Sequence, residues 1–251
     1  MKKCILAALF LIIALNSFAQ TYTITYSDGA IISPEKLKEL PYEIQQRALL
    51  KKQYTLTISN NTSEYRMSVN VEPDPIAITT PTERITYQNE EYYYKDLTQK
   101  KMLIEAGSGK NLYHVADNLL PWNWEIFPET RTIAGYTCQK AVATLKGITF
   151  TAWFTKDIPV ATGPQKYDGL PGIILAAGNG HREVVAESVA IIKKDTAIGK
   201  PIFKDKTITF MEMIADVEKN IQRINGPANK PTTTLKPGGV TETSHTEVYK
   251  Y

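Results

Sequence analysis

The sequence predicts an α+β protein built on a curved, mainly antiparallel β-sheet that resembles a half-open barrel and carries two flanking helices. Two observations lead to this fold class. Apolar and polar residues alternate with period two in many short stretches, and turn-forming residues separate these stretches. Only two longer segments show the helical spacing of three and four. We therefore expect roughly nine or ten strands in one sheet.

The N-terminal half is expected to contain a strand, a broken helix and then a meander of strands. The first strand is predicted over residues 21–26, and the helix over 34–52, with Ser33 as its cap. Pro41 lies inside that helix, so we expect a kink or two short helices that meet near Leu40. Asn60 and Asn61 indicate a hairpin. The strands predicted around and after this hairpin cover residues 54–58, 65–71, 84–87, 91–96, 101–105 and 113–116.

The C-terminal half is expected to contain further strands and one helix. Strands are predicted over residues 138–144, 149–154, 173–177 and 182–192. The stretch 173–177 is apolar on both alternating faces, which indicates a strand that is covered on both sides. The second helix is predicted over 210–224, with Gly226 and Pro227 ending it.

The ends of the chain differ in composition from the rest. Residues 1–19 combine Lys2 and Lys3 with an apolar run and a small-residue cleavage site, which predicts a cleavable signal peptide. The run is shorter than the roughly 20 residues that span a bilayer, so no transmembrane anchor is expected after cleavage. Residues 20–225 are predicted to form a single β-rich domain. Residues 226–251 are rich in Pro, Thr and Gly and are predicted to be a mostly disordered tail.

The signal peptide predicts a periplasmic or secreted protein. Cys4 precedes the apolar run, whereas a lipid-anchor cysteine would follow it at the cleavage point, so none is expected. Cys138 is then the single remaining cysteine, and we interpret it as a small buried hydrophobic residue rather than a reactive thiol or a metal ligand.

Charge gives no reason to expect nucleic acid or an anionic membrane as a partner. The formal net charge of the chain is +3, and it falls to +1 without Lys2 and Lys3.

One turn-rich stretch precedes the most apolar strand and carries a recognisable motif. It is Gly169, Leu170, Pro171, Gly172, Ile173 and Ile174. Pro171 and Gly172 predict a type II turn in which Gly172 has a positive φ. The motif resembles the signature of the GLPGLI family, with isoleucine where the family name has its second leucine. Trp124, residues 133–141 and residues 152–154 stand in the order typical of that family. The resemblance covers roughly 122–175 and implies an exported protein without an assigned biochemical activity. On this basis the motif is a structural one.

Four aromatic residues near the motif are candidates for lining an apolar groove. They are Trp122, Trp124, Trp153 and Tyr167. The alternative, which the sequence leaves open, is that they are core residues, because large aromatic side chains dominate core burial.

The sequence assigns no catalytic residue, no metal ligand and no cofactor, because the common hydrolase and metal-site motifs are not found in it. The leading hypothesis is a non-catalytic, envelope-associated protein that binds a hydrophobic ligand, a peptide or a partner protein through the concave face of the sheet.

Two alternatives stay open. One is a hydrolase that uses acidic residues near the motif: Asp157, Asp168, Glu125 and Glu129. The other is a metal-handling protein that uses residues such as His114, His181, His245 and Cys138.

Overall fold

The computed structural model describes residues 20–68, 91–108, 111–192 and 196–225. The predicted signal peptide, the predicted strand over 84–87 and the predicted tail lie outside these residues. The elements are β1 Thr21–Ala30, α2 Pro34–Glu39, α3 Tyr42–Leu49, β2 Lys52–Ser59, β3 Thr62–Met67, β4 Tyr92–Asp96, β5 Lys101–Ser108, β6 Asn111–Asn118, β7 Glu125–Ile133, β8 Tyr136–Leu145, β9 Ile148–Thr155, β10 Ile173–Gly178, β11 Arg182–Ile192 and α4 Phe210–Asn225.

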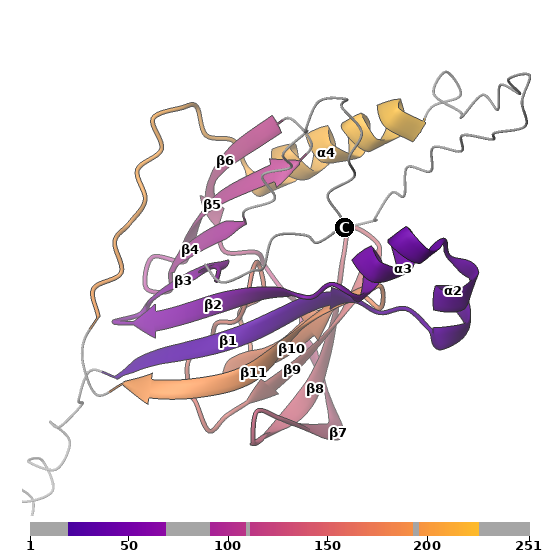
Figure 1. The fold of residues 1–251 in the computed structure, drawn as a ribbon. Coiled ribbons are helices and arrows are strands. Elements are labelled where there is room, and N and C mark those ends of the chain that lie inside the picture. Colours follow the sequence, from indigo (N-terminus) through magenta and orange to yellow (C-terminus); the bar gives the residue numbers. More distant parts are fainter. Residues whose placement is uncertain (1–19, 69–90, 109–110, 193–195, 226–251) are drawn as a thin grey trace, which may run out of the picture.

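All eleven strands form one curved antiparallel sheet (Figure 1). Their order is β6-β5-β4-β3-β2-β1-β11-β10-β9-β8-β7. Strand β1 lies at the centre, where it pairs with β2 on one side and with β11 on the other. The sheet is therefore built from two meanders that β1 and β11 join, and its two edge strands, β6 and β7, follow each other in the sequence.

The helices cover the sheet only locally, so the sheet dominates the fold. Ser33 caps α2 by accepting a hydrogen bond from the Lys36 amide, and the chain breaks at Pro41 before α3, which confirms the prediction of two short helices. Helix α4 packs against β6, and Phe210, Met213 and Val217 form its buried face. Asp117 at the end of β6 accepts a hydrogen bond from the Phe210 amide, which fixes the start of α4.

Most of the core lies on one side of the sheet, which we call the inner face. It carries Tyr26, Tyr54, Tyr65 and Tyr93 from β1 to β4, and Ala152 and Phe154 from β9. Alternation within each strand places these residues on one side, because directly paired residues of antiparallel strands share a face. The segment 119–124 and the loop 156–172 cover this inner face.

Within the described residues, the hairpin between β2 and β3 and the predicted strands agree with the structure except at one edge. Asn60 and Asn61 have φ values of 48° and 59°, as a two-residue hairpin turn requires. Strand β7 was not predicted, because it contains Pro128 and its pairing with β8 is interrupted between Ile126 and Thr130. A proline and an irregular register are common in edge strands, and they remove the regular alternation on which prediction relies.

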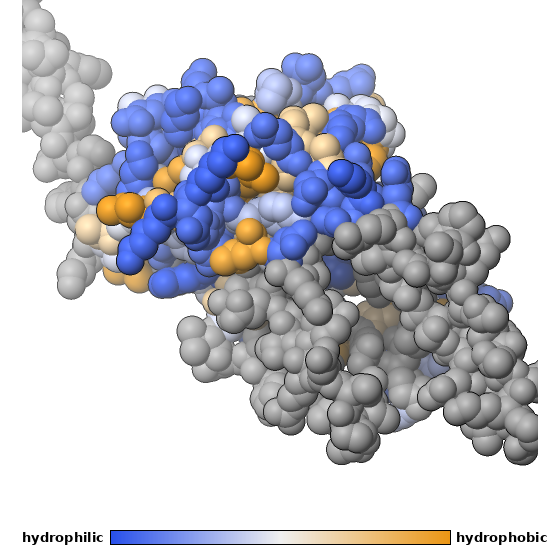
Figure 2. Space-filling model, turned by 90° about the horizontal axis from the view of Figure 1, so that it is seen from above, coloured by the Kyte–Doolittle hydropathy of each residue, from blue (hydrophilic) through white to orange (hydrophobic). Residues whose placement is uncertain are grey.

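The side of the molecule that carries β6 and α4 is largely hydrophilic. Figure 2 shows that the hydrophobic residues on this side form small, separate groups among hydrophilic ones. Scattered apolar residues of this kind are normal on protein surfaces and do not by themselves mark a binding site.

Candidate functional site

The loop 156–172 joins β9 to β10 and crosses the inner face, where polar contacts tie it to three strands. Gln165 donates to Asp28 of β1 over 3.4 Å, and the hydroxyls of Thr162 and Ser63 of β3 lie 3.4 Å apart. Lys95 of β4 donates to two loop carbonyl groups. The loop is therefore anchored across the inner face as a structural part of the interior.

Lys95 and Asp168 form a buried ion pair beneath this loop. Their side chains are 2% and 3% exposed, and Lys95 Nζ lies 3.5 Å from Asp168 Oδ2. The same ammonium group donates to the carbonyl oxygens of Tyr167 at 2.6 Å and Gly163 at 3.3 Å. Burial lowers the pKa of Lys95 and raises the pKa of Asp168, because both charged forms lose hydration, while their mutual attraction opposes both shifts. The Lys95 ammonium group thus fixes the loop 156–172 against the inner face of the sheet.

The motif Gly169 to Ile174 forms a different turn from the predicted one. The Gly172 amide donates to the Leu170 carbonyl oxygen at 2.8 Å, which closes a three-residue γ-turn around Pro171. The φ of Gly172 is positive as predicted, but at +156° it is far from the value near +80° that a type II turn has at this position. The Ile173 amide also donates to the Ile158 carbonyl oxygen and not to that of Leu170. The prediction of a type II turn was therefore wrong, since it did not include pairing between the loop and the start of β10.

The structure explains in two different ways why glycine stands at two positions of the motif. Gly169 has a φ of +83°, a conformation that favours glycine. Gly172 has a φ of +156°, and a Cβ atom there would overlap the carbonyl group of Thr155, 2.7 Å from its carbon. Backbone geometry and close packing account for both residues.

Trp122 and Trp124 form a partly exposed stacked pair, which we call the tryptophan pair. Their ring centroids are 4.9 Å apart, and the planes differ by 20°. The indole N–H of Trp122 donates to the Lys166 carbonyl oxygen at 3.0 Å, and that of Trp124 donates to the Asp168 carbonyl oxygen at 2.8 Å. The pair lies in the segment that joins β6 to β7, so it is fixed against the loop between the two edges of the sheet.

The aromatic candidates separate into two places. Trp122 stacks on Tyr167 at 5.6 Å and meets the edge of Phe150 at 5.4 Å, so three of the four predicted residues lie together. Trp153 alternates with Phe154 along β9, lies on the opposite side of the sheet and faces the guanidinium of Arg131 at 5.8 Å. Tyr167 is buried, whereas Trp122 and Trp124 keep exposed surface.

A row of four tyrosines on the inner face was not identified from the sequence. This tyrosine row is Tyr26, Tyr54, Tyr65 and Tyr93 on β1 to β4. Tyr54 and Tyr65 stack with ring centroids 4.9 Å apart, and Tyr65 meets the edges of Tyr26 and Tyr93, each at 6.1 Å. Fourteen tyrosines in the chain were the available signal, but only the register of four strands makes these four neighbours.

In the described part of the chain, the tyrosine row has one buried polar atom without a hydrogen-bond partner. Tyr26 donates its hydroxyl hydrogen to the Ile174 carbonyl oxygen at 2.7 Å. The hydroxyl of Tyr65 is buried and has no hydrogen-bond partner in the described part of the chain. Buried hydroxyl groups normally have one, so this atom needs an explanation.

The four carboxylates proposed for a hydrolase have no shared buried environment. Asp168 is buried against Lys95, whereas Asp157, Glu125 and Glu129 are exposed. Glu129 faces Lys140 across 3.4 Å, and hydrogen bonding to its own backbone amide lowers its pKa. A general acid and base would have to face one substrate, and these contacts bring no two of the four carboxylates together.

The residues considered for a metal site are also placed apart. His114 stacks on Phe203 at 4.4 Å and contacts Glu105, and His181 lies in the turn before β11. Cys138 is buried, and burial raises the pKa of its thiol to about 11. His245 lies outside the described residues. Within residues 20–225 as described, no group of three or more His, Cys, Asp or Glu side chains is arranged to hold a metal ion.

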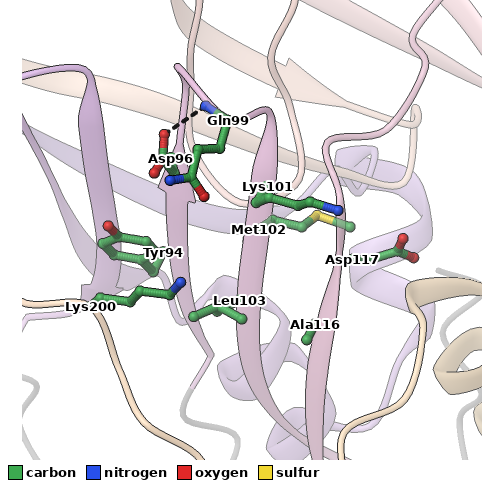
Figure 3. Close-up of a pocket in the computed structure, with 9 residues that line it drawn as sticks. All are labelled: Tyr94, Asp96, Gln99, Lys101, Met102, Leu103, Ala116, Asp117 and Lys200. Atoms are coloured by element: carbon green, nitrogen blue, oxygen red, sulfur yellow. Dashed lines mark hydrogen bonds between the residues drawn. The ribbon is translucent and has the colours of Figure 1, made fainter.

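A shallow cavity of about 300 Å³ lies at β4 to β6 (Figure 3). Its carboxylates already accept hydrogen bonds, Asp96 from the Gln99 amide and Asp117 from the amides of Asn118 and Phe210. Lys101 donates to Asn118. These contacts fix the turn after β4 and the start of α4, so the cavity is explained by local structure.

None of the helices in the described part of the chain has the length and apolar character needed to cross a bilayer.

A family model described as "Protein of unknown function (Porph_ging)" matches residues 142–176. This segment includes β9, the loop 156–172 and most of β10. The comparison with curated proteins finds no match. The family match therefore covers the segment that holds the motif and brings no activity with it.

Two solved structures share the fold. They are structures of PNGF-II in the C2 and P21 space groups, with TM-scores of 0.51 and 0.52. Each is 20% identical to this chain and covers 80% of it. The match covers 33% and 34% of those chains, so this chain spans about a third of the length of PNGF-II. At this identity the comparison supports the fold alone.

Proposed function

We propose that this protein is a non-catalytic binding protein that takes a hydrophobic group at the tryptophan pair. The hydrophobic group belongs to a small ligand, or to a peptide or protein of the cell envelope. The single observation that carries the proposal is that Trp122 and Trp124 stay partly exposed although both indole N–H groups are already bonded to the loop. Their free ring surface is therefore apolar, rigid and placed between the two edges of the sheet.

Rigidity is the physical reason that this surface suits binding. An aromatic ring that is already fixed by a hydrogen bond loses little conformational entropy when a ligand covers it. Lys166 lies over the rings of Phe150 and Tyr167, at 5.4 and 4.8 Å, and supplies a cation beside the apolar surface. A hydrophobic group with an attached polar or anionic end fits this arrangement.

The test uses N-phenyl-1-naphthylamine, a neutral hydrophobic dye whose fluorescence rises when it is bound. We expect saturable binding to the purified protein, and Trp124→Leu should weaken it about fivefold, as the loss of one aromatic contact predicts. The matched control is Trp153→Leu, which changes a tryptophan on the opposite side of the sheet and should leave the affinity unchanged. Equal losses in both variants, or dye binding without saturation, would count against the proposal.

We also propose that the protein is exported after removal of residues 1–19, and that residues 20–225 form its single β-rich domain. The support is the pattern of residues 1–19, a charged start followed by an apolar run and small residues. N-terminal sequencing of protein recovered from the cell envelope or medium should begin near Gln20. A sequence that begins at Met1 would contradict export by cleavage.

The hydrolase and the metal-handling alternatives stay predictions, and no contact among the described residues favours either of them.

A further inference from the structure

The sheet register places two carboxylates at one end of the tyrosine row. Asp28 follows Tyr26 by two residues on β1, and Glu91 precedes Tyr93 by two residues at the start of β4. Strands β1 and β4 run in opposite directions, because three antiparallel pairings separate them. Both carboxylates therefore lie on the inner face at the same end of the row.

The partners of the two carboxylates differ. Asp28 accepts from Arg182 at 3.0 Å and from Gln165 at 3.4 Å, so its charge is partly compensated. Glu91 is half-buried and forms no ion pair with the described residues. Burial raises its pKa, and the nearby charge of Asp28 adds to this effect, while Lys166, Lys52 and Arg182 oppose it. A half-buried carboxylate without a direct partner is costly unless a cation approaches it.

The unpartnered hydroxyl of Tyr65 belongs to the same group of side chains. Asp28 and Glu91 are close enough that their charges raise the pKa of Tyr65, after the larger effect of burial, and the same holds for Tyr93. The ring of Tyr54 stacks on that of Tyr65, and the charges of Glu91 and Asp28 also raise the pKa of Tyr54, after the larger effect of burial. A phenol oxygen accepts hydrogen bonds, and the face of a tyrosine ring attracts cations. Among the described residues, a hydroxyl without a hydrogen-bond partner, a carboxylate without an ion pair and aromatic rings therefore lie at the same end of the row.

We propose that this end of the tyrosine row binds an organic ammonium group, with Glu91 as its counter-ion and the Tyr65 hydroxyl as a hydrogen-bond acceptor. A primary amine satisfies both groups at once, since one ammonium carries three donors. The site contains neither Trp122 nor Trp124, although Lys166 lies near both places. It is therefore proposed as a second site, and it does not depend on the proposed function.

The experiment titrates the protein with n-butylammonium chloride and follows binding by ligand-observed NMR. Sodium butyrate and n-butanol are the matched anionic and neutral probes. We expect n-butylammonium to bind and the other two to bind at least about fivefold more weakly, because only the cation pairs with Glu91. Tighter binding of butyrate would overturn the proposal and assign the site to an anion held by Lys52, Lys166 and Arg182.

Two variants test the named groups, with a third as control. Tyr65→Phe keeps the stacked ring and removes the hydroxyl, and Glu91→Gln removes the charge. Each should weaken n-butylammonium binding about tenfold, the usual effect of one charged hydrogen bond. Tyr94→Phe, on the opposite face of β4, should leave it unchanged. If Tyr65→Phe lowers the melting temperature so far that this variant is not folded during the titration, the result for Glu91→Gln tests the proposal. Unchanged affinity in Glu91→Gln, or no n-butylammonium binding to the native protein at millimolar concentrations, would refute the proposal.

Dye binding separates the two sites. Tyr65→Phe and Glu91→Gln should bind N-phenyl-1-naphthylamine as the native protein does. A loss of dye binding in these variants would show that the two sites are one.

Discussion

The loop 156–172 and the tyrosine row lie on the same inner face, but they differ in whether their buried polar groups have hydrogen-bond partners. In the loop, the carbonyl groups of Gly163 and Tyr167 accept from Lys95, and those of Lys166 and Asp168 accept from the tryptophan pair. In the row, the rings pack closely but the hydroxyl of Tyr65 has no described partner. Asp168 Oδ2 in the loop also accepts no hydrogen bond among the described residues, but the Lys95 ammonium group lies 3.5 Å from it. The charge of the buried loop carboxylate is thus compensated within the fold, whereas the Tyr65 hydroxyl has no described partner and is the atom on which the proposed second site rests.

Removal of the Lys95 ammonium should give the largest loss of stability. Lys95→Met leaves the Asp168 carboxylate buried without a counter-ion and deprives two carbonyl groups of a donor, so we expect the free energy of unfolding to fall by about 4 kcal/mol. Urea denaturation measures this change. The double variant Lys95→Met with Asp168→Asn should lose less than the single variant, because no charge is left unpaired. Equal losses would show that the pair is not charged in the folded protein.

Replacement of Gly172 should give the next largest effect. Gly172→Ala forces a Cβ atom against the carbonyl group of Thr155, so β9 and the loop must separate, and we expect a loss of about 3 kcal/mol. The control is Gly180→Ala. Gly180 has a φ of +82° but open space around it, so only backbone strain applies and the loss should be about 1 kcal/mol. Similar melting temperatures for the two variants would contradict the close packing at Gly172.

The smallest changes in the free energy of unfolding should come from two tyrosines of the row. One has a hydroxyl with a hydrogen-bond partner and the other has a hydroxyl without a described one. Tyr26→Phe leaves the buried Ile174 carbonyl oxygen without its donor and should cost about 1.5 kcal/mol. Tyr65→Phe removes a hydroxyl that has no described partner and should change the free energy of unfolding by less than about 0.5 kcal/mol. Thermal unfolding of both variants measures the difference. A loss for Tyr65→Phe as large as that for Tyr26→Phe would show that a structural hydrogen bond to Tyr65 exists.

Local patterns in the sequence were sufficient to predict most of the described helices, strands and turns. Alternation predicted nearly all the described strands, Pro41 predicted the break between α2 and α3, and Asn60 with Asn61 predicted the hairpin between β2 and β3. These features depend on residues near each other in the chain, because turn geometry and side-chain period are local properties. Strand β7 was missed because its edge position removes that local signal.

The candidate sites needed contacts between distant segments. The sequence indicated Trp122, Trp124 and Tyr167 as aromatic neighbours of the motif, but it gave no reason to separate Trp153 from them. Strand alternation alone places Trp153 on the other side of β9, once Phe154 is known to be inside. No local sequence pattern indicated Lys95 or Glu91, because the ion pair of Lys95 and the proposed role of Glu91 both depend on residues far away in the chain.

By itself the sequence determined most of the strands, the two breaks at Pro41 and Asn60, and the position of the motif before a buried strand. The tertiary structure decided the rest: the central place of β1 between β2 and β11, the burial of Lys95 against Asp168, and the meeting of the tyrosine row with Asp28 and Glu91. The physical reason is that strand propensity and turn chemistry are short-range, whereas strand order and register follow from burial of the whole inner face at once.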